Sequence, residues 1–285
     1  MKVLITGAKG QLGQDLQKEI ENQRIECIGL GHNDLDITDF GSVKEALEFH
    51  KPSIVINCAA YNAVDKAEEN WKKAFLVNGI GVRNLAVVSE KIKAMFVHFS
   101  TDYVFDGEKG KPYTIADKPN PINKYGQSKL LGEEFVKSLH TRYFLIRVSW
   151  VFGSGGKEEA NFIKKLMKWA KDKQTLKVVD DQISSPTYTV DLAKAVMKLI
   201  KTEAYGLYHI TNQGICSRYD WAKYVLEKIH WKGKLLPAKS EEFPAPAKRP
   251  KFSALDNFPL KETFGYELPY WKDATDRFLK EMGWV

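Results

Sequence analysis

A tyrosine and a lysine four residues apart, Tyr125 and Lys129, form the pair in this sequence most suited to acid–base chemistry. On a helix this spacing places both side chains on one face, one turn apart. A free phenol, with a pKa of about 10, is a weak acid at neutral pH. A neighbouring ammonium stabilises the phenolate and lowers the pKa, so the pair could deliver and recover a proton. An exposed tyrosine beside a solvated lysine is the alternative.

A polar segment, Ser100-Thr101-Asp102, follows an apolar run at residues 95–99 that we expect to be a strand. In a parallel sheet, ligands bind at the carboxyl ends of the strands. Thr101 would then lie beside Tyr125 and could hydrogen-bond a substrate carbonyl. Thr101, Tyr125 and Lys129 are therefore the predicted catalytic residues.

A glycine-rich loop at residues 6–13 lies between a predicted strand and a predicted helix. Gly7 allows a tight turn, Gly10 lets the backbone approach a pyrophosphate, and Gly13 allows the helix to pack on the sheet. The helix N-terminus would present free N–H groups and a partial positive charge to the phosphates. We predict a dinucleotide site that includes Gln11 and Leu12; a structural turn without a ligand is the alternative.

The segments after the second and third predicted strands bear on the cofactor. Residues 29–33 contain neither an acid for ribose hydroxyls nor an arginine for a 2′-phosphate, so NADH and NADPH both stay open. Asp36 and Ile37 are expected to bracket the adenine. Ala59, Ala60 and Tyr61 would let a cofactor lie against the backbone, with plain helix–sheet packing as the alternative. We identify no metal site in the sequence.

Two residues outside these motifs are candidates for substrate binding. Trp150 follows the fifth predicted strand, where an aromatic ring could stack on a sugar or base, or belong to the core. Arg249 lies in a proline-rich segment at residues 243–250, where it could hold a substrate diphosphate. A surface arginine or a structural ion pair is the alternative for Arg249.

The elements that position these residues alternate between apolar runs and helical stretches. Strands apolar on both faces and separated by helices predict a parallel sheet covered on both sides. The expected strands are residues 3–6, 25–30, 53–58, 95–99 and 144–148. The expected helices are residues 11–21, 41–50 with Ser42 as a possible N-cap, 65–90, 160–171, 189–201 and 218–230.

The fold class that follows is α/β: a Rossmann-type, doubly wound parallel sheet with a smaller, discontinuous C-terminal substrate domain. We place an NAD(P)-binding domain at residues 1–150, to which about residues 175–200 return. Residues 151–285 are expected to be mainly substrate-binding, because the glycine-rich loop at 153–156 and the proline-rich segment mark a change of character.

Composition narrows the class of protein. The 43 basic and 36 acidic residues give a net charge of +7, and 44% hydrophobic residues suffice for a core. Lysines alternate with glutamates, which favours a solvated surface over a nucleic-acid partner. Three scattered cysteines without a Cys-x-x-Cys pair and the absence of an apolar run of about 18 residues predict a reduced, cytoplasmic protein without a membrane span. The sequence leaves a homodimer open.

The glycine spacing and the Tyr-x-x-x-Lys pair are typical of the short-chain dehydrogenase/reductase superfamily. The chain resembles one extended family within it, the dTDP-4-dehydrorhamnose reductases. The resemblance lies in residues 7–13, 57–68, 100–107, 121–133, 147–153, 180–187 and 249–255. It implies that NADPH or NADH reduces the 4-keto group of dTDP-4-dehydro-L-rhamnose to dTDP-L-rhamnose, a step of dTDP-rhamnose biosynthesis. The partner would be a dTDP-4-keto-6-deoxy sugar.

The same resemblance implies roles for individual residues. Tyr125 would be the proton donor, and Lys129 its electrostatic partner and a ribose ligand. Asp102 would contact the sugar together with Thr101, and the other substrate-binding residues would be Phe105, Tyr125, Trp150 and Arg249. At residues 183–185 the chain departs from the family, which commonly has an aromatic residue, a glycine and a small residue there. This departure leaves the fine substrate preference open.

Two other classes of function compete with this one, another nucleotide-sugar enzyme and a non-catalytic protein. A nucleotide-sugar 4-epimerase would retain NAD and need no added reductant. A 4,6-dehydratase would carry a glutamate directly after Asp102, where this chain has Tyr103. A non-catalytic protein, of the kind that regulates methionine adenosyltransferase, keeps much of the same motif set. Binding to a partner enzyme with no turnover of any keto sugar would favour such a subunit.

Overall fold

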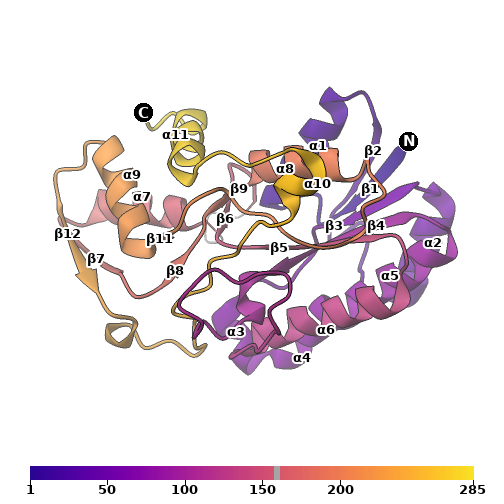
Figure 1. The fold of residues 1–285 in the computed structure, drawn as a ribbon, viewed down its shortest axis with the longest axis horizontal. Helices are drawn as coiled ribbons and strands as arrows, with labels where there is room; N and C mark the ends of the chain where they lie inside the picture. Colours follow the sequence, from indigo (N-terminus) through magenta and orange to yellow (C-terminus); the bar gives the residue numbers. More distant parts are fainter. Residues whose placement is uncertain (157–160) are drawn as a thin grey trace.

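A parallel sheet of six strands forms the centre of the molecule (Figure 1). The computed structural model describes residues 1–156 and 161–285. The sheet order is β10-β5-β4-β3-β1-β2, so the chain crosses from β2 over β1 to β3, which makes the carboxyl ends of β1 and β3 a topological switch point. The strands are β1 (Lys2–Thr6), β2 (Glu26–Leu30), β3 (Ile54–Asn57), β4 (Met95–Thr101), β5 (Tyr143–Val148) and β10 (Gly206–His209).

The five strands expected from the sequence are present, and β10 is a sixth that the sequence analysis missed. It pairs only with β5 and is an edge strand of four residues, Gly-Leu-Tyr-His, without the β-branched run of the others. Short edge strands give little periodic signal.

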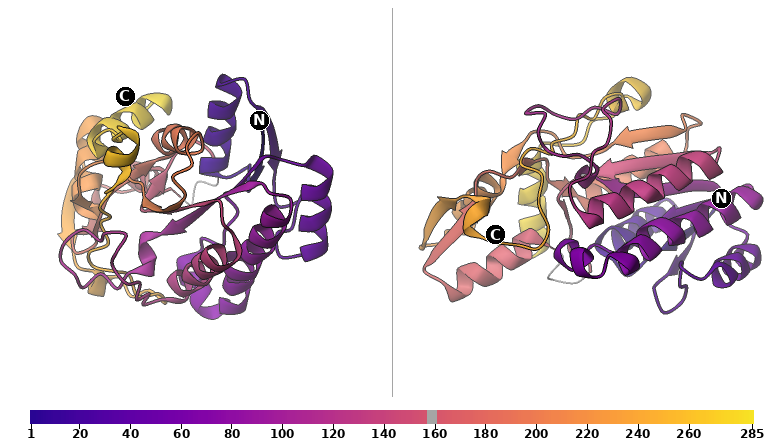
Figure 2. Two further views of the ribbon diagram at one scale, coloured as in Figure 1. Left: turned by 45° about the vertical axis from the view of Figure 1, so that its right-hand side comes forward. Right: turned by 90° about the horizontal axis from the view of Figure 1, so that it is seen from below.

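Helices cover both faces of this sheet, as a Rossmann-type fold requires (Figures 1 and 2). The side chains of β1 alternate between two cores: Val3 and Ile5 pack toward one, and Leu4 toward the other. One face carries α1 (Gln11–Asn22) and α8 (Thr189–Leu199), and the other carries α2 (Phe40–His50), α5 (Val82–Lys91) and α6 (Lys124–Leu139). The N-cap of α2 is Asp39, whose carboxylate accepts from the Ser42 N–H, and not Ser42 itself.

A smaller region lies beyond the carboxyl ends of the central strands (Figure 1). Its core is aromatic and includes Phe152, Trp221 and Phe278. Of the residues expected to return to the first domain, α8 does pack on α1, whereas β7 pairs with β12 in this smaller region. Its elements are β6 (Val151–Phe152), α7 (Phe162–Asp172), β7 (Thr175–Val179), β8 (Ile183–Ser184), β9 (Thr187–Tyr188), β11 (Cys216–Ser217), α9 (Arg218–Lys228), β12 (Lys234–Ala238), the 3-10 turn η4 (Ser240–Glu242) and α11 (Trp271–Glu281). The short helix α10 (Leu260–Phe264) packs instead on the core of the central sheet, where Leu260 is buried. Residue 160, where the helix that became α7 was expected to begin, lies outside the described residues.

The long helix expected at residues 65–90 is interrupted. It consists of α3 (Val64–Glu69), α4 (Trp71–Phe75), a π-helical turn η1 (Leu76–Gly81) and α5. Asn70, with φ −103° and ψ 41°, ends α3, a break that helical periodicity alone does not reveal. The π-helical turn carries Asn78, whose side chain accepts from the Tyr61 N–H at 2.8 Å and donates to the Ser128 hydroxyl at 2.9 Å. Asn78 thus ties the loop after β3 to α6.

A buried ion pair fixes α6 on the sheet. The Glu133 carboxylate accepts from the Arg147 guanidinium at 2.9 and 2.6 Å and from the Ser100 hydroxyl at 2.5 Å. Burial alone would raise the pKa of Glu133, but the hydrogen bonds and charge of Arg147 hold that pKa below its usual value. Tyr125, Lys129 and Glu133 follow each other at intervals of four residues, so they share the helix face turned toward the sheet.

Within residues 1–156 and 161–285, no helix is both long enough and apolar enough to cross a membrane.

We expect Glu133→Gln to lower the free energy of unfolding by about 3–5 kcal/mol, because it leaves the buried Arg147 charge without its counter-ion. Urea denaturation measures this change. Glu134→Gln is the matched control: Glu134 is exposed and pairs only with Lys137 at 3.3 Å, so its effect should stay within about 0.5 kcal/mol. Equal effects of the two substitutions would show that the buried pair does not stabilise the fold.

Candidate active site

A cavity of about 890 Å³ crosses the carboxyl ends of β1, β3 and β4 and continues to the smaller region. Its near wall is formed by residues 10–13, 57–60 and 62–66, and its far wall by residues from α7, β7 and α9. The cavity therefore lies at the switch point of the sheet, where open α/β folds bind ligands.

The glycine loop is shaped for close approach of the backbone to another group. Gly7 has φ +65°, and a Cβ there would lie 2.5 Å from the Ala59 nitrogen. A Cβ on Gly13 would lie 2.6 Å from the Gly7 carbonyl oxygen. Gly10 is the N-cap of α1 and supplies no side-chain cap. Free N–H groups at this helix N-terminus can hold phosphate oxygens, so the loop fits a dinucleotide.

Of the other predicted cofactor residues, Gln11, Leu12, Ala59 and Ala60 line the cavity. The Gln11 side chain also reaches the smaller region, because its oxygen accepts from the Gly153 N–H at 3.0 Å and from the Asn161 amide at 3.1 Å. Gln11 thus connects the glycine loop to the second region.

A buried hydrogen-bond network beneath the cavity was not anticipated from the sequence. The Asn57 side-chain oxygen accepts from the Thr6 hydroxyl at 2.6 Å and from the Ala59 N–H at 3.1 Å. The Asn57 amide nitrogen lies 3.0 Å from Nδ1 of His98, whose pKa is lowered by burial. The network fixes the turn after β3 against the glycine loop. A polar residue ending an apolar strand was its only sequence signal.

Four predicted cofactor residues are not in the wall of the cavity: Gly7, Asp36, Ile37 and Tyr61. Gly7 lies against the Cys58–Ala59 backbone, on the side of the glycine loop that does not line the cavity. Asp36 is exposed and accepts from the Thr38 N–H at 2.9 Å, while Ile37 is buried.

Phe105 is not at the cavity, contrary to the expectation that it binds substrate. Its side chain is fully buried, and its ring stacks on Tyr113 with centroids 4.1 Å apart. The Arg147 guanidinium lies 5.0 Å from the same ring. Phe105 therefore belongs to a small buried cluster with Val104, Tyr113 and Leu255.

The three predicted catalytic residues meet at the cavity. Thr101 ends β4, and Tyr125 and Lys129 lie in the first two turns of α6, which Asn123 caps by accepting from the Gly126 N–H at 2.8 Å. The Thr101 hydroxyl donates to Asp102 at 3.0 Å, and the Tyr125 hydroxyl lies 3.5 Å from the Asn62 side-chain oxygen. The Lys129 ammonium donates to the Phe99 carbonyl at 2.6 Å.

The electrostatics of this group differ from the sequence-based expectation. Burial raises the pKa of Tyr125, and the nearby Thr101 hydroxyl only partly opposes this rise. The ammonium was expected to lower that pKa, but it is bonded to the Phe99 carbonyl. Burial also lowers the pKa of Lys129 to about 8. The phenol is therefore protonated at neutral pH.

Asp102 lies beside these residues and is itself buried. Its carboxylate accepts from the Ser253 hydroxyl at 2.6 Å as well as from Thr101. Burial raises the pKa of Asp102 to about 6, although both hydroxyls favour the charged form.

Trp150 and Arg249 both line the cavity. Trp150 has φ +45°, a left-handed conformation that is strained for a bulky residue. One face of its ring is covered by the guanidinium of Arg218, 3.6 Å from the ring centroid. Arg249 is paired with Asp65 at 2.7 Å, the structural ion pair that the sequence left as an alternative. Sequence reasoning missed Arg218, which follows the helix cap Ser217 and matches no motif.

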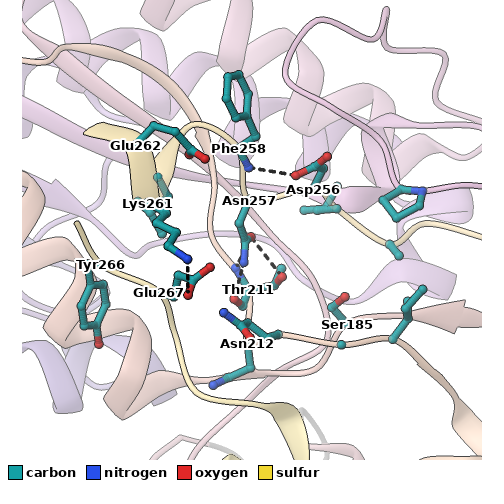
Figure 3. Close-up of a pocket in the computed structure, with 17 residues that line it drawn as sticks. Ser185, Thr211, Asn212, Asp256, Asn257, Phe258, Lys261, Glu262, Tyr266 and Glu267 are labelled. Atoms are coloured by element: carbon teal, nitrogen blue, oxygen red, sulfur yellow. Dashed lines mark hydrogen bonds and ion pairs between the residues drawn. The ribbon is translucent and has the colours of Figure 1, made fainter. Parts of the chain in front are cut away.

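A second cavity, of about 500 Å³, lies around α10 and the end of β10 (Figure 3). Its polar groups satisfy one another: the Asn257 side-chain oxygen accepts from the Thr211 N–H at 3.0 Å, and Lys261 pairs with Glu267 at 3.2 Å (Figure 3). It contains none of the predicted catalytic residues. Among the described residues, no three His, Cys, Asp or Glu side chains are grouped so that they could hold a metal ion.

Comparison with known proteins shows which family the chain is similar to. The family model of the RmlD substrate binding domain matches residues 1–283. The spore coat polysaccharide biosynthesis protein SpsK of Bacillus subtilis is 41% identical, over 98% of this chain and 97% of that protein. A dTDP-4-dehydrorhamnose reductase of Aggregatibacter actinomycetemcomitans is 37% identical, over 96% of each chain. The crystal structure of dTDP-4-dehydrorhamnose reductase from Bacillus anthracis in complex with NADP has a TM-score of 0.95 and 42% identity, and covers 99% of this chain and 100% of that chain.

We expect Gly7→Ala to abolish NADPH binding and to destabilise the protein, because the new Cβ would collide with the Cys58–Ala59 backbone. Gly110→Ala is the matched control: Gly110 has φ +69° with nothing within 4 Å of a Cβ, so it should lose only about 1–2 kcal/mol of stability and keep its cofactor affinity. NADPH fluorescence titration and urea denaturation measure both effects. If the two variants behave alike, backbone strain explains Gly7 and the close approach does not.

Proposed function

This chain belongs to the dTDP-4-dehydrorhamnose reductase family, and from that premise we propose that it reduces the 4-keto group of dTDP-4-dehydro-L-rhamnose to give dTDP-L-rhamnose. It is an NAD(P)H-dependent oxidoreductase of dTDP-rhamnose biosynthesis. The observation that carries the proposal is the meeting of Thr101, Tyr125 and Lys129 with the glycine loop in one cavity.

The cofactor fits the near half of this cavity. NADPH or NADH, when bound, supplies the hydride. The loop at residues 10–13 would hold the pyrophosphate through backbone N–H groups, while Ala59 and Ala60 leave room beside the third strand. Asp36, Ile37 and Tyr61 are proposed to flank the adenosine end, and Lys129 the nicotinamide ribose.

Tyr125 is the proposed proton donor to the carbonyl oxygen of the sugar. Reduction of a ketone needs a protonated acid at the start of the reaction, and burial keeps the phenol in this form. Thr101 is proposed to hydrogen-bond the same carbonyl oxygen. Lys129, whose ammonium is fixed on the Phe99 carbonyl, is proposed to stabilise the negative charge that develops on the phenolate after the proton has left.

The far half of the cavity is the proposed sugar-nucleotide site. Asp102 would accept from a sugar hydroxyl, and the Trp150 ring, which lines the cavity, would pack near the sugar. Arg249 is proposed to contact the substrate from the rim, with part of its guanidinium already bound to Asp65. In this proposal, residues 1–150 with α8 form the cofactor domain, and residues 151–285 mainly bind substrate.

We expect Tyr125→Phe to lower kcat by about 10²–10⁴-fold, because the variant lacks the proton that the carbonyl oxygen must receive. The assay is NADPH or NADH oxidation with dTDP-4-dehydro-L-rhamnose, and cofactor affinity should be retained. Tyr205→Phe, which alters a tyrosine outside the cavity, is the control and should behave as the wild type.

Each other outcome of this assay has a definite meaning. Wild-type protein that oxidises no cofactor with this sugar contradicts the proposed reaction. Conversion of the sugar without added NADPH or NADH would indicate an epimerase. Full activity in Tyr125→Phe would remove Tyr125 from the role of proton donor.

We expect kcat/KM to depend on pH as a bell, measured from about pH 5 to about pH 9. The acid limb should lie near pH 6, where Asp102 becomes protonated and loses its charge as pH falls. The alkaline limb should lie near pH 8, where Lys129 loses its proton as pH rises. Asp102→Asn should lower activity and remove the acid limb; an acid limb that persists in this variant would contradict the assignment.

A further inference from the structure

Arg218 is a charged residue of the cavity that neither the sequence motifs nor the proposed reaction uses. It is the first residue of α9, and its guanidinium lies 3.6 Å from the centroid of the Trp150 ring and 4.8 Å from that of Phe162. Burial lowers the pKa of Arg218 to about 10, which leaves the side chain charged at neutral pH.

The guanidinium of Arg218 is held by aromatic rings and not by a carboxylate. Three other arginines that are at least partly buried each have an acidic partner within 2.7 Å: Glu133 for Arg147, Asp65 for Arg249 and Asp191 for Arg277. Among the described residues no ion pair or hydrogen bond of the Arg218 side chain is found, and the nearest acidic influence on it is the charge of Asp102, which raises its pKa only in part. A guanidinium carries five N–H donors in a planar fork that suits phosphate oxygens.

The surroundings of Arg218 indicate what kind of anion would reach it. It lines the same cavity as the catalytic residues and lies close enough to Asp102 and Tyr103 for their charges to act on it. Lys165, on α7, also lines this half, and it has no ion pair among the described residues. At the same wall are two aromatic side chains with large exposed fractions, Trp169 at 39% and Phe243 at 46%. Flat exposed rings can stack on a base.

We propose that Arg218 binds the diphosphate of the nucleoside-diphosphate sugar, and that Trp150 serves mainly as the platform that orients its guanidinium. The proposal rests on the proposed function and adds a binding residue to the substrate site. Arg249 is the less suitable diphosphate ligand because Asp65 already neutralises its charge and occupies its Nη2 group. Stacking on Trp150 fixes the plane of the Arg218 fork without using its N–H donors.

The test compares binding of dTDP and of thymidine, which differ by the diphosphate alone. Isothermal titration is done with the enzyme saturated with NADP⁺. Arg218→Gln should weaken dTDP binding by about 10- to 100-fold, the loss expected for charge-assisted hydrogen bonds, and leave thymidine binding unchanged. Arg218→Lys keeps the charge but not the planar fork, so its loss should be intermediate. Arg83→Gln, which alters an exposed arginine on α5, is the matched control and should bind dTDP as the wild type does.

Two results would overturn the proposal. One is unchanged dTDP affinity in Arg218→Gln that still binds NADP⁺. The other is equal weakening of dTDP and thymidine, which would mean that Arg218 only supports the Trp150 ring. If Arg218→Gln fails to fold, Arg218→Lys decides by the same comparison, and wild-type affinity for dTDP in this variant overturns the proposal.

The proposal and the function on which it rests fail in different ways. Wild-type protein that binds dTDP through Arg218 but does not oxidise NADPH with the keto sugar contradicts the reaction and keeps the diphosphate ligand. Wild-type protein that reduces the sugar while Arg218→Gln retains its KM contradicts the ligand and keeps the reaction.

Discussion

The buried pair of Glu133 and Arg147 is the interaction on which the geometry of the cavity depends. Glu133 lies on α6 one turn below Lys129 and two turns below Tyr125, and Arg147 lies on β5, which β4 and β3 separate from β1, the strand before the glycine loop. The same carboxylate accepts from Ser100, which directly precedes Thr101. The Glu133 carboxylate therefore fixes α6, which carries Tyr125, against β5 through Arg147 and against β4, which carries Thr101, through Ser100. Since burying these charges costs free energy, only good geometry makes the pair stabilising.

Local patterns in the sequence were sufficient for the parts of the site that lie close together along the chain. The glycine loop, the Tyr-x-x-x-Lys pair and the polar end of β4 each follow from spacing and from the strand–loop–helix order. Phe105 shows the limit of this reasoning. It lies within a motif segment, yet its ring faces the core, because neighbours in sequence need not share a surface. Arg218 shows the opposite case, where tertiary packing alone places the residue in the cavity.

The pKa values of the catalytic groups could not be predicted from the sequence either. Spacing indicates that an ammonium lies near a phenol, but the cost of desolvation depends on what the rest of the fold places around them. Here burial acts in opposite directions on the two groups: it raises the pKa of Tyr125 and lowers that of Lys129 to about 8. Both shifts favour the neutral forms. A neutral phenol is the form that can donate to a ketone, so burial itself prepares the site for reduction.

The net charge of +7 does not itself show which cations are available to a ligand in the cavity. That depends on the partner of each cationic side chain. Asp65 neutralises Arg249 and Glu242 neutralises Lys177, so these side chains add little to the field inside the cavity. Arg218 is different, because aromatic rings hold it and leave its N–H donors available. The Asp102 charge offsets part of the cost of burying Arg218 without an ion pair, and a bound anion would remove more of it. Binding of a diphosphate would relieve the free-energy cost of burying Arg218, and this relief would add to the affinity for the diphosphate.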